Sequence, residues 1–320
     1  MFSRHTVPEI AFSVLFASEL TFYLLILQTG IVEYHHSDLH EIWMVPAGGV
    51  LGIVASIFAY RHRGWLVPLL LFGQTLLSFG YTDDSGVEMF AFGLISGLTA
   101  PLLIARIDRF ITVMVALGGS YLVGTYYFDL PPDSRTAIAV TLSAVAFWAS
   151  LFSRMGMPRH QRTTGSLPTT AVIFFWLILD AALFETLLRD PGMHIWGEAP
   201  YTPVIVAFHL IGVAVAFKLR EWRHSDLFIL FFFLLAYATY TLKFQLLLSA
   251  VYPFVISFYN VIILDRFRNL HYPNLAVAAL SLWIASGFGL MIALDRFIGV
   301  AWAVLALLAL IHLTQRRLYA

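Results

Sequence analysis

The stretch Ser153-Arg154-Met155-Gly156-Met157-Pro158-Arg159-His160-Gln161-Arg162-Thr163-Thr164-Gly165-Ser166 lies at the middle of the chain, with long apolar blocks on both sides of it. It contains three arginines, two glycines and a proline. Charged side chains and a broken backbone are costly in hydrocarbon, so this stretch is expected to lie in water. It therefore predicts a linker at 153–167 between a first domain at 1–152 and a second domain at 168–320.

The composition on either side of this linker is that of a membrane protein. The 320 residues are 60% hydrophobic and 12% charged, whereas soluble domains are roughly half apolar and about a quarter charged. The formal net charge of +0 indicates no nucleic-acid partner. There is no cysteine, which excludes disulfides and thiolate metal sites, and we expect no cofactor.

The apolar blocks have the lengths expected of membrane-spanning helices. A span needs about 20 mainly apolar residues, and fewer where protein covers its ends. On this rule the sequence predicts an all-α polytopic protein with twelve transmembrane helices, six in each half. Their ranges are 8–31, 42–60, 64–81, 87–106, 109–127 and 135–152, then 168–188, 201–218, 226–242, 245–264, 273–292 and 295–314.

The placement of basic residues predicts the orientation of these spans, because cytoplasmic loops carry the excess of Lys and Arg. With the N-terminus inside, all but four of the 19 basic residues fall on the cytoplasmic side. The exceptions are Arg135, Arg189, Lys243 and Arg296. We therefore expect both termini to be cytoplasmic.

The two halves also repeat short motifs in the same order, at an offset of about 157–160 residues. Tyr81-Thr82 returns as Tyr240-Thr241, and Ile107-Asp108-Arg109-Phe110 returns as Leu264-Asp265-Arg266-Phe267. Because each half has an even number of spans, both run in the same direction. The pattern predicts two six-helix pseudo-repeats related by an axis along the membrane normal.

This organisation resembles the major facilitator superfamily, whose members have six plus six helices, cytoplasmic termini and a central cytoplasmic loop. The loop signature of that superfamily has a counterpart in Tyr60-Arg61-His62-Arg63-Gly64, which lacks the usual aspartate. Ten-helix drug/metabolite transporters have a similar chain length, but the charge pattern favours twelve spans. Glycines in 42–60, 109–127, 201–218 and 273–292 predict close helix packing at these four spans.

The first helix of each half contains one carboxyl group near its middle. These are Glu19 and Asp180, which lie at nearly equivalent positions of the repeat. Ionisable groups at membrane depth usually face a cavity or each other. Low dielectric favours the protonated carboxyl, so both residues are candidates for proton coupling. The alternative is a structural carboxyl that is hydrogen-bonded to Tyr23 or to a backbone carbonyl.

Two further groups of residues are candidate sites. Asp108 with Arg109, and Asp265 with Arg266, lie at helix ends and are candidates for gating ion pairs. The outer loop at 33–41 contains His35, His36 and His40, and the matching loop of the second half contains His194. Imidazoles near carboxylates are suitable ligands for a divalent transition metal, although solvated loop histidines are also common.

These features predict a secondary active transporter that couples a small neutral or cationic solute to protons, by symport and alternating access. The spans have almost no mid-depth Arg or Lys to offset an anionic solute. The alternatives are a transition-metal ion transporter that uses the outer histidines, and a non-transport membrane subunit or assembly factor. We find no Walker A, Gly-x-Ser-x-Gly or His-Glu-x-x-His motif and expect no enzyme activity. The expected partners are the lipid bilayer and a small-molecule or ion substrate, with the chain as a monomer in a bacterial inner membrane.

Overall fold

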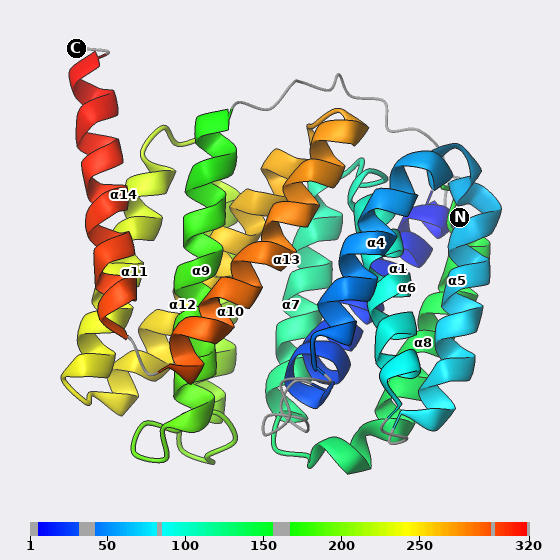
Figure 1. Ribbon diagram of the computed structural model, residues 1–320, viewed down its shortest axis with the longest axis horizontal. Helices are drawn as coiled ribbons and strands as arrows, with labels where there is room; N and C mark the ends of the chain where they lie inside the picture. Colours follow the sequence, from blue (N-terminus) through cyan, green and yellow to red (C-terminus); the bar gives the residue numbers. More distant parts are fainter. Residues whose placement is uncertain (1–5, 32–41, 82–84, 156–166, 296–297, 319–320) are drawn as a thin grey trace. The chain divides into compact units, whose positions relative to one another are not determined.

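The computed structural model describes residues 6–31, 42–81, 85–155, 167–295 and 298–318 (Figure 1). Over these ranges the chain forms helices joined by short turns, without a β-strand. It divides into two compact units, Met1–Thr164 with Leu264–Leu280, and Gly165–Ile263 with Ser281–Ala320. The boundary at Thr164 falls within the linker predicted at 153–167.

The first unit is built from the helices of the N-terminal half. α1, Thr6–Phe22, continues directly as a π-helix, η1, and the α-helices that follow are separated by short 3-10 turns. The elements are η1 Tyr23–Ile31, α4 Met44–Ala59, η2 Tyr60–His62, α5 Arg63–Leu77, η3 Ser78–Gly80, α6 Gly86–Ile104, α7 Phe110–Tyr126, η4 Pro132–Arg135 and α8 Thr136–Phe152.

The C-terminal half forms longer helices. They are α9 Leu167–Arg189, α10 Thr202–Leu219, α11 Ser225–Thr241, α12 Gln245–Arg268, α13 Tyr272–Leu294 and α14 Ile298–Leu318. Within the second unit, α9, α11 and α14 pack against one another. The end of α12 and the start of α13 belong to the first unit.

Two side chains of Leu264–Leu280 contact other residues of the first unit. Arg268 donates a hydrogen bond to the carbonyl oxygen of Asp108 at 3.2 Å, and its guanidinium lies 5.4 Å from the ring centroid of Phe110. The ring of Tyr272 stacks on Tyr60 with a centroid distance of 3.9 Å. This segment, which the sequence assigns to the second domain, thus packs with the first unit, and the division into two six-helix domains stays a prediction.

By length and composition, eight helical segments of the described chain can cross a membrane, and the chain is an all-helical, multi-pass membrane protein. Shorter apolar helices are Phe110–Tyr126, Ser225–Thr241 and Ile298–His312. One of the eight, Met44–Gly80, is 37 residues long and contains both α4 and α5. A helix lies in each range that the sequence assigns to a span. That twelve helices cross the bilayer, with both termini inside, stays a prediction.

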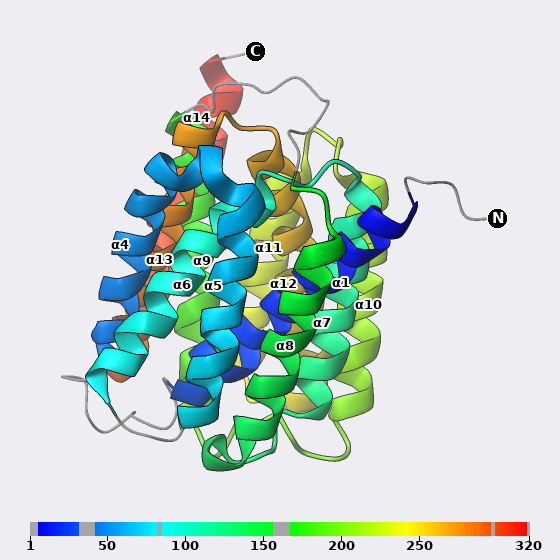
Figure 2. The same ribbon diagram turned by 90° about the vertical axis from the view of Figure 1, so that its right-hand side faces the viewer.

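In the first unit, α4 and α6 pack with their backbones in contact, and Figure 2 shows α4, α6 and α5 side by side. A Cβ added to Gly52 would lie 2.2 Å from the carbonyl oxygen of Leu94. One added to Gly93 would lie 2.0 Å from the carbonyl oxygen of Val45. Any larger residue at these positions would push the two helices apart, so the glycines set the helix spacing.

The second unit has an equivalent contact between α10 and α12. A Cβ added to Gly212 would lie 2.5 Å from the carbonyl oxygen of Phe254. Gly212 and Phe254 follow Gly52 and Leu94 by about 160 positions, the offset of the repeated motifs. Close packing is therefore present at Gly52 of α4 and Gly212 of α10, and in both cases the partner is a helix of the same unit.

Candidate functional site

The carboxyl group of Glu19 lies in α1, four residues before the start of the π-helix η1, and is half-buried. Its Oε1 accepts a hydrogen bond from Nε2 of Gln74 on α5 at 2.9 Å. Gln74 is 1% exposed, so its amide is held in place. The hydrogen-bond partner shown for Glu19 is thus an uncharged side chain, and no ion pair of Glu19 is found within the described residues.

Buried hydroxyl groups extend this polar contact into the interface of α5 and α8. Ser78 donates to the carbonyl oxygen of Gln74 at 2.7 Å, and the hydroxyl of Ser143 lies 3.3 Å from that of Ser78. Both serines are fully buried. Glu19 therefore faces a row of neutral polar groups, all of which have a hydrogen-bond partner.

The π-helix η1 spans nine residues, Tyr23–Ile31, and is held by a buried arginine. Such helices are rare and are frequent at functional sites. Arg135 is 1% exposed, and its Nη1 donates to the carbonyl oxygen of Leu25 and to the hydroxyl of Thr29, both at 2.8 Å. Its other donors bond at 2.8 Å to the carbonyl oxygens of Leu130 and Phe128. The sequence indicates Arg135 only as an outer loop residue, and no local pattern predicts its burial.

Asp180 lies in α9 of the second unit and is also half-buried. Two tyrosines of α12 bond to its carboxylate. Tyr259 donates to Oδ2, and the hydroxyl of Tyr252 lies 2.9 Å from both Oδ1 and the backbone carbonyl oxygen of Asp180, which share its one proton. Tyr252 and Tyr259 are 0% and 1% exposed. Residues seven apart share one helix face, so α12 presents both hydroxyls to α9. A third buried tyrosine, Tyr237 of α11, donates to the backbone carbonyl of Leu179 at 2.7 Å.

An aromatic and polar group adjoins this site within the second unit. The ring of Trp196 lies 6.3 Å from that of Tyr252, edge to face, and 6.3 Å from that of His209, stacked. Nδ1 of His209 lies 2.7 Å from the hydroxyl oxygen of Ser257. His209 is therefore a buried residue of the interface between α10 and α12, with Ser257 as its partner.

The same positions of the first unit carry glycines. Gly49 and Gly97 precede His209 and Ser257 by about 160 residues. A Cβ added to Gly97 would lie 2.1 Å from the carbonyl oxygen of Gly49. The interface of α10 and α12 thus has a hydrogen-bonded side-chain pair where the interface of α4 and α6 has a contact of two backbones.

One of the residues expected to form gating ion pairs, Asp265, has another partner. Asp265 pairs with Arg268, whose Nε and Nη2 both lie 2.9 Å from Oδ1. Asp108 is half-buried and Arg109 is exposed at the start of α7, while Arg266 lies in the last turn of α12. Arg268 was not among the predicted site residues, although its spacing of three residues from Asp265 on a helix is typical of an ion pair. A gating role for these residues stays a prediction.

The candidate metal ligands are mostly outside the described residues. This applies to His35, His36 and His40, whereas His194 is described and lies half-buried in the loop after α9. Across the described ranges, no group of three or more His, Cys, Asp or Glu side chains is placed to hold a metal ion. Metal binding by the outer histidines stays a prediction.

At the end of α9, Asp190 connects to the corner between α11 and α12. Its Oδ2 accepts hydrogen bonds from Lys243 at 2.8 Å and from Tyr240 at 2.9 Å, and Oδ1 accepts from the backbone of Gly192 at 3.0 Å. Burial raises the pKa of Asp190, but these hydrogen bonds and the charge of Lys243 outweigh it and lower the pKa. Lys243 has a φ of 59° and forms the left-handed corner that ends α11, so the ion pair also fixes this turn.

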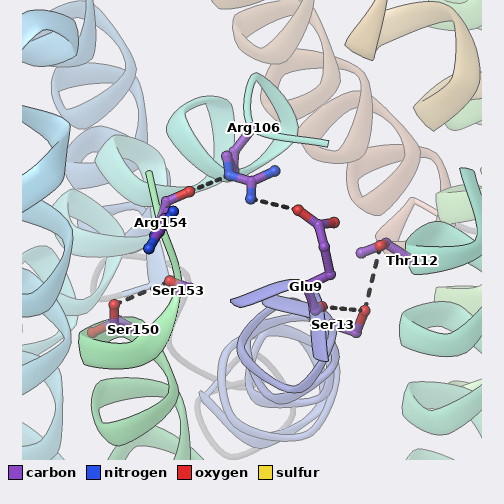
Figure 3. Close-up of polar contacts among 7 residues, drawn as sticks. All are labelled: Glu9, Ser13, Arg106, Thr112, Ser150, Ser153 and Arg154. Atoms are coloured by element: carbon purple, nitrogen blue, oxygen red, sulfur yellow. Dashed lines mark hydrogen bonds and ion pairs between the residues drawn. The ribbon is translucent and has the colours of Figure 1, made fainter. Parts of the chain in front are cut away.

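A buried arginine also joins three helix ends of the first unit (Figure 3). Nη2 of Arg106 lies 2.8 Å from Oε1 of Glu9, and Nε donates to the carbonyl oxygen of Arg154. The guanidinium lies 4.8 Å from the ring centroid of Phe12. Arg106 therefore ties the start of α1 to the end of α6 and to the residues after α8, a role that its sequence context does not indicate.

No protein-family model matches the sequence, and a search of curated proteins returned no match. Among solved structures, the human organic anion transporter MFSD10 (TETRAN) is similar to this chain with a TM-score of 0.47 and 15% sequence identity. The similarity covers 96% of this chain and 100% of that chain. Because the TM-score is below 0.5, the proposals below rest on residues of this chain alone.

Proposed function

We propose that this protein is a proton-coupled secondary transporter that moves a small neutral or cationic solute by alternating access. The observation that carries the proposal is the pair of mid-helix carboxyl groups, Glu19 and Asp180, at equivalent positions of the repeat. Each is half-buried, and each is hydrogen-bonded to uncharged groups in the described chain. A carboxyl group at membrane depth is costly unless it takes up a proton or binds a cation.

The packing within each unit supports alternating access. The contacts of Gly52 with Leu94 and of Gly212 with Phe254 follow the sequence repeat. Two halves with the same internal helix contacts are what a duplicated transporter needs, because each half then behaves as one packed body. The proposal includes twelve spans in two six-helix halves.

The placement of basic residues supports the class of solute. In the described helices, basic residues lie in the first or last turns, as Arg63, Arg189 and Lys218 do. An anionic solute would need a fixed cation near the middle of the membrane to offset the loss of its hydration. Neutral and cationic solutes do not have this requirement.

Glu19 is the better candidate for the proton. One hydrogen bond, from Gln74, holds its Oε1, whereas Asp180 has a hydrogen bond at both oxygens. A proton can therefore be added to Glu19 without displacing a donor. Asp180 then serves as the partner of Glu19 in the transport cycle or as a substrate contact.

The test uses the full chain in vesicles with an imposed pH gradient and a panel of neutral and cationic solutes. Glu19→Gln keeps the shape of the side chain and removes its change in charge. It should abolish accumulation of the transported solute while exchange between equilibrated compartments continues. Glu221→Gln is the matched control, because Glu221 is 84% exposed, and it should behave as the wild type.

Two results would contradict the proposal. If Glu19→Gln accumulates solute with the wild-type pH dependence, Glu19 is a structural carboxyl. If the wild type moves no solute and instead co-purifies with a stable partner, the chain is a membrane subunit or assembly factor. For the transition-metal alternative, no contact in the described chain favours it.

A further inference from the structure

We propose that Asp180 binds the positive charge of an organic ammonium substrate and that Tyr252 and Tyr259 are the positioning residues that hold its carboxylate. The inference deepens the transporter function proposed above and rests on it. It assigns separate tasks to the two carboxyl groups, with the proton at Glu19 and the substrate charge at Asp180.

The carboxylate of Asp180 has no positively charged partner among the described residues. Asp180 lies near the middle of the span Thr169–Arg189. Buried carboxylates are normally paired with a cation or bound to a metal. In the described chain the polar partners of Asp180 are the hydroxyls of Tyr252 and Tyr259, which carry no charge. A cationic ligand would supply the charge that the protein does not.

Tyr252 and Tyr259 are more buried than the aspartate they hold. Both are essentially buried, whereas Asp180 is only half-buried. A carboxylate has about four acceptor positions on its two oxygens. The two phenols occupy one position on each oxygen from the buried side. At least two acceptor positions therefore remain for a ligand, on a residue that is itself partly exposed.

The equivalent positions of the first unit do not carry tyrosines. Phe92 and Thr99 of α6 precede Tyr252 and Tyr259 by about 160 positions. Phe92 has no hydroxyl and packs on Phe22 at a ring distance of 5.9 Å. The hydroxyl of Thr99 donates to the carbonyl of its own helix, at Ile95, at 2.8 Å. Of these two sets of equivalent positions, only the set in the second unit therefore has phenol groups that bond to a carboxylate.

The geometry favours an ammonium group over a metal ion. Calcium and magnesium need about six oxygen ligands, and transition metals need several N, O or S ligands. Asp180 supplies two oxygens, and it belongs to no group of three His, Cys, Asp or Glu side chains in the described residues. An organic cation has a diffuse charge and is bound by one carboxylate without a complete ligand shell.

The binding experiment uses the purified full chain in detergent without a gradient. The probe is benzyltrimethylammonium, which keeps its charge at every pH, and its neutral isostere neopentylbenzene serves as the control ligand. The wild type should bind the cation saturably and in preference to the isostere. Asp180→Asn should weaken binding of the cation by roughly thirtyfold or more and remove this preference. Asp180→Glu keeps the charge and should retain the preference.

The tyrosines are tested with single hydroxyl deletions. Tyr252→Phe and Tyr259→Phe should each weaken binding of the cation by roughly three- to tenfold. Tyr237→Phe is the matched control, because this buried tyrosine donates to a backbone carbonyl. In infrared difference spectra, the carboxylate band of Asp180 is the one that Asp180→Asn lacks. This band should shift in Tyr252→Phe and in Tyr259→Phe. It should also shift when the wild type binds the cation. It should not shift in Tyr237→Phe.

Several outcomes would overturn the inference. They are no ammonium binding to the wild type, unchanged affinity in Asp180→Asn, or an equal band shift in all three tyrosine variants. A protonated-carboxyl band that belongs to Asp180 and does not respond to the cation would assign Asp180 to the proton instead. The transport function can be refuted without refuting the binding site. If the cation binds in a manner that depends on Asp180 but a gradient drives no accumulation, the transport cycle is wrong and the ammonium site is retained.

Discussion

Replacing Gly289 by alanine should force α13 away from α9 beside the Asp180 site. A Cβ at Gly289 would lie 2.4 Å from Cβ of Ala181 and 2.8 Å from the backbone nitrogen of Ala182. Non-bonded carbon atoms are most stable at about 3.5–4.0 Å, so the contact is short by about 1 Å or more. Neither neighbouring atom belongs to a flexible side chain. Relief of the clash therefore requires the helices to separate.

The matched control is Gly287→Ala in the same helix, because an added Cβ at Gly287 meets no atom within 4 Å. Alanine favours a helix over glycine by up to about 1 kcal/mol, and this gain is common to both variants. It cancels when the two are compared. The difference that remains is the cost of overpacking, about 1–3 kcal/mol.

Thermal unfolding of the two purified variants in the same detergent measures this difference. For domains of about 150–250 residues, 1 kcal/mol shifts the midpoint by about 2–4 °C. Gly289→Ala should therefore unfold roughly 2–12 °C below Gly287→Ala. Because Ala181 directly follows Asp180, Gly289→Ala should also weaken ammonium binding, and Gly287→Ala should not. Equal midpoints would show that α9 and α13 do not have this close contact.

Two other predictions concern polar groups. Arg135→Lys keeps the charge but lacks the planar set of donors that binds four acceptors, so it should lower the unfolding midpoint by several degrees. The control is Arg109→Lys, which should have little effect because Arg109 is exposed. Equal midpoints in the two variants would contradict the role of Arg135. Because the folded pKa of Asp190 is lowered, its contribution to stability is present above the usual value of 3.8 and is lost as the pH falls through the folded pKa. Asp190→Asn should therefore be less stable than wild type at pH 7 by less than about 1 kcal/mol, since Lys243 is 56% exposed. This difference should shrink in unfolding series carried to pH 3, and a constant difference would refute the assignment.

The helices were predictable to within a few residues. The sequence places a span at 42–60, and α4 covers Met44–Ala59; it places another at 168–188, and α9 covers Leu167–Arg189. A single apolar segment in a bilayer must form all of its backbone hydrogen bonds within itself, and only a helix does this. Breaks are equally local, as at Arg61, where charged residues interrupt the long apolar segment Met44–Gly80.

The partners of the candidate residues were much less predictable. The sequence shows that Glu19 and Asp180 lie at mid-helix, but it does not show that Gln74 or the two tyrosines face them. A hydrogen bond over dozens of residues depends on which faces of two helices meet, and a helix with apolar residues on all sides gives little indication of this. The ion pair between Arg268 and Asp265 could have been predicted, because the two residues lie only three positions apart in the sequence.

The sequence by itself determined where this chain forms helices, which of their residues are ionisable, and where glycines permit close approach. The tertiary structure alone decided that Gly52 faces Leu94, that Gly289 faces Ala181, and that Arg135 is buried against the π-helix. The physical reason is the range of the interactions. Backbone hydrogen bonds and apolar length act within one segment, whereas packing and side-chain hydrogen bonds depend on how whole helices are rotated and placed against each other.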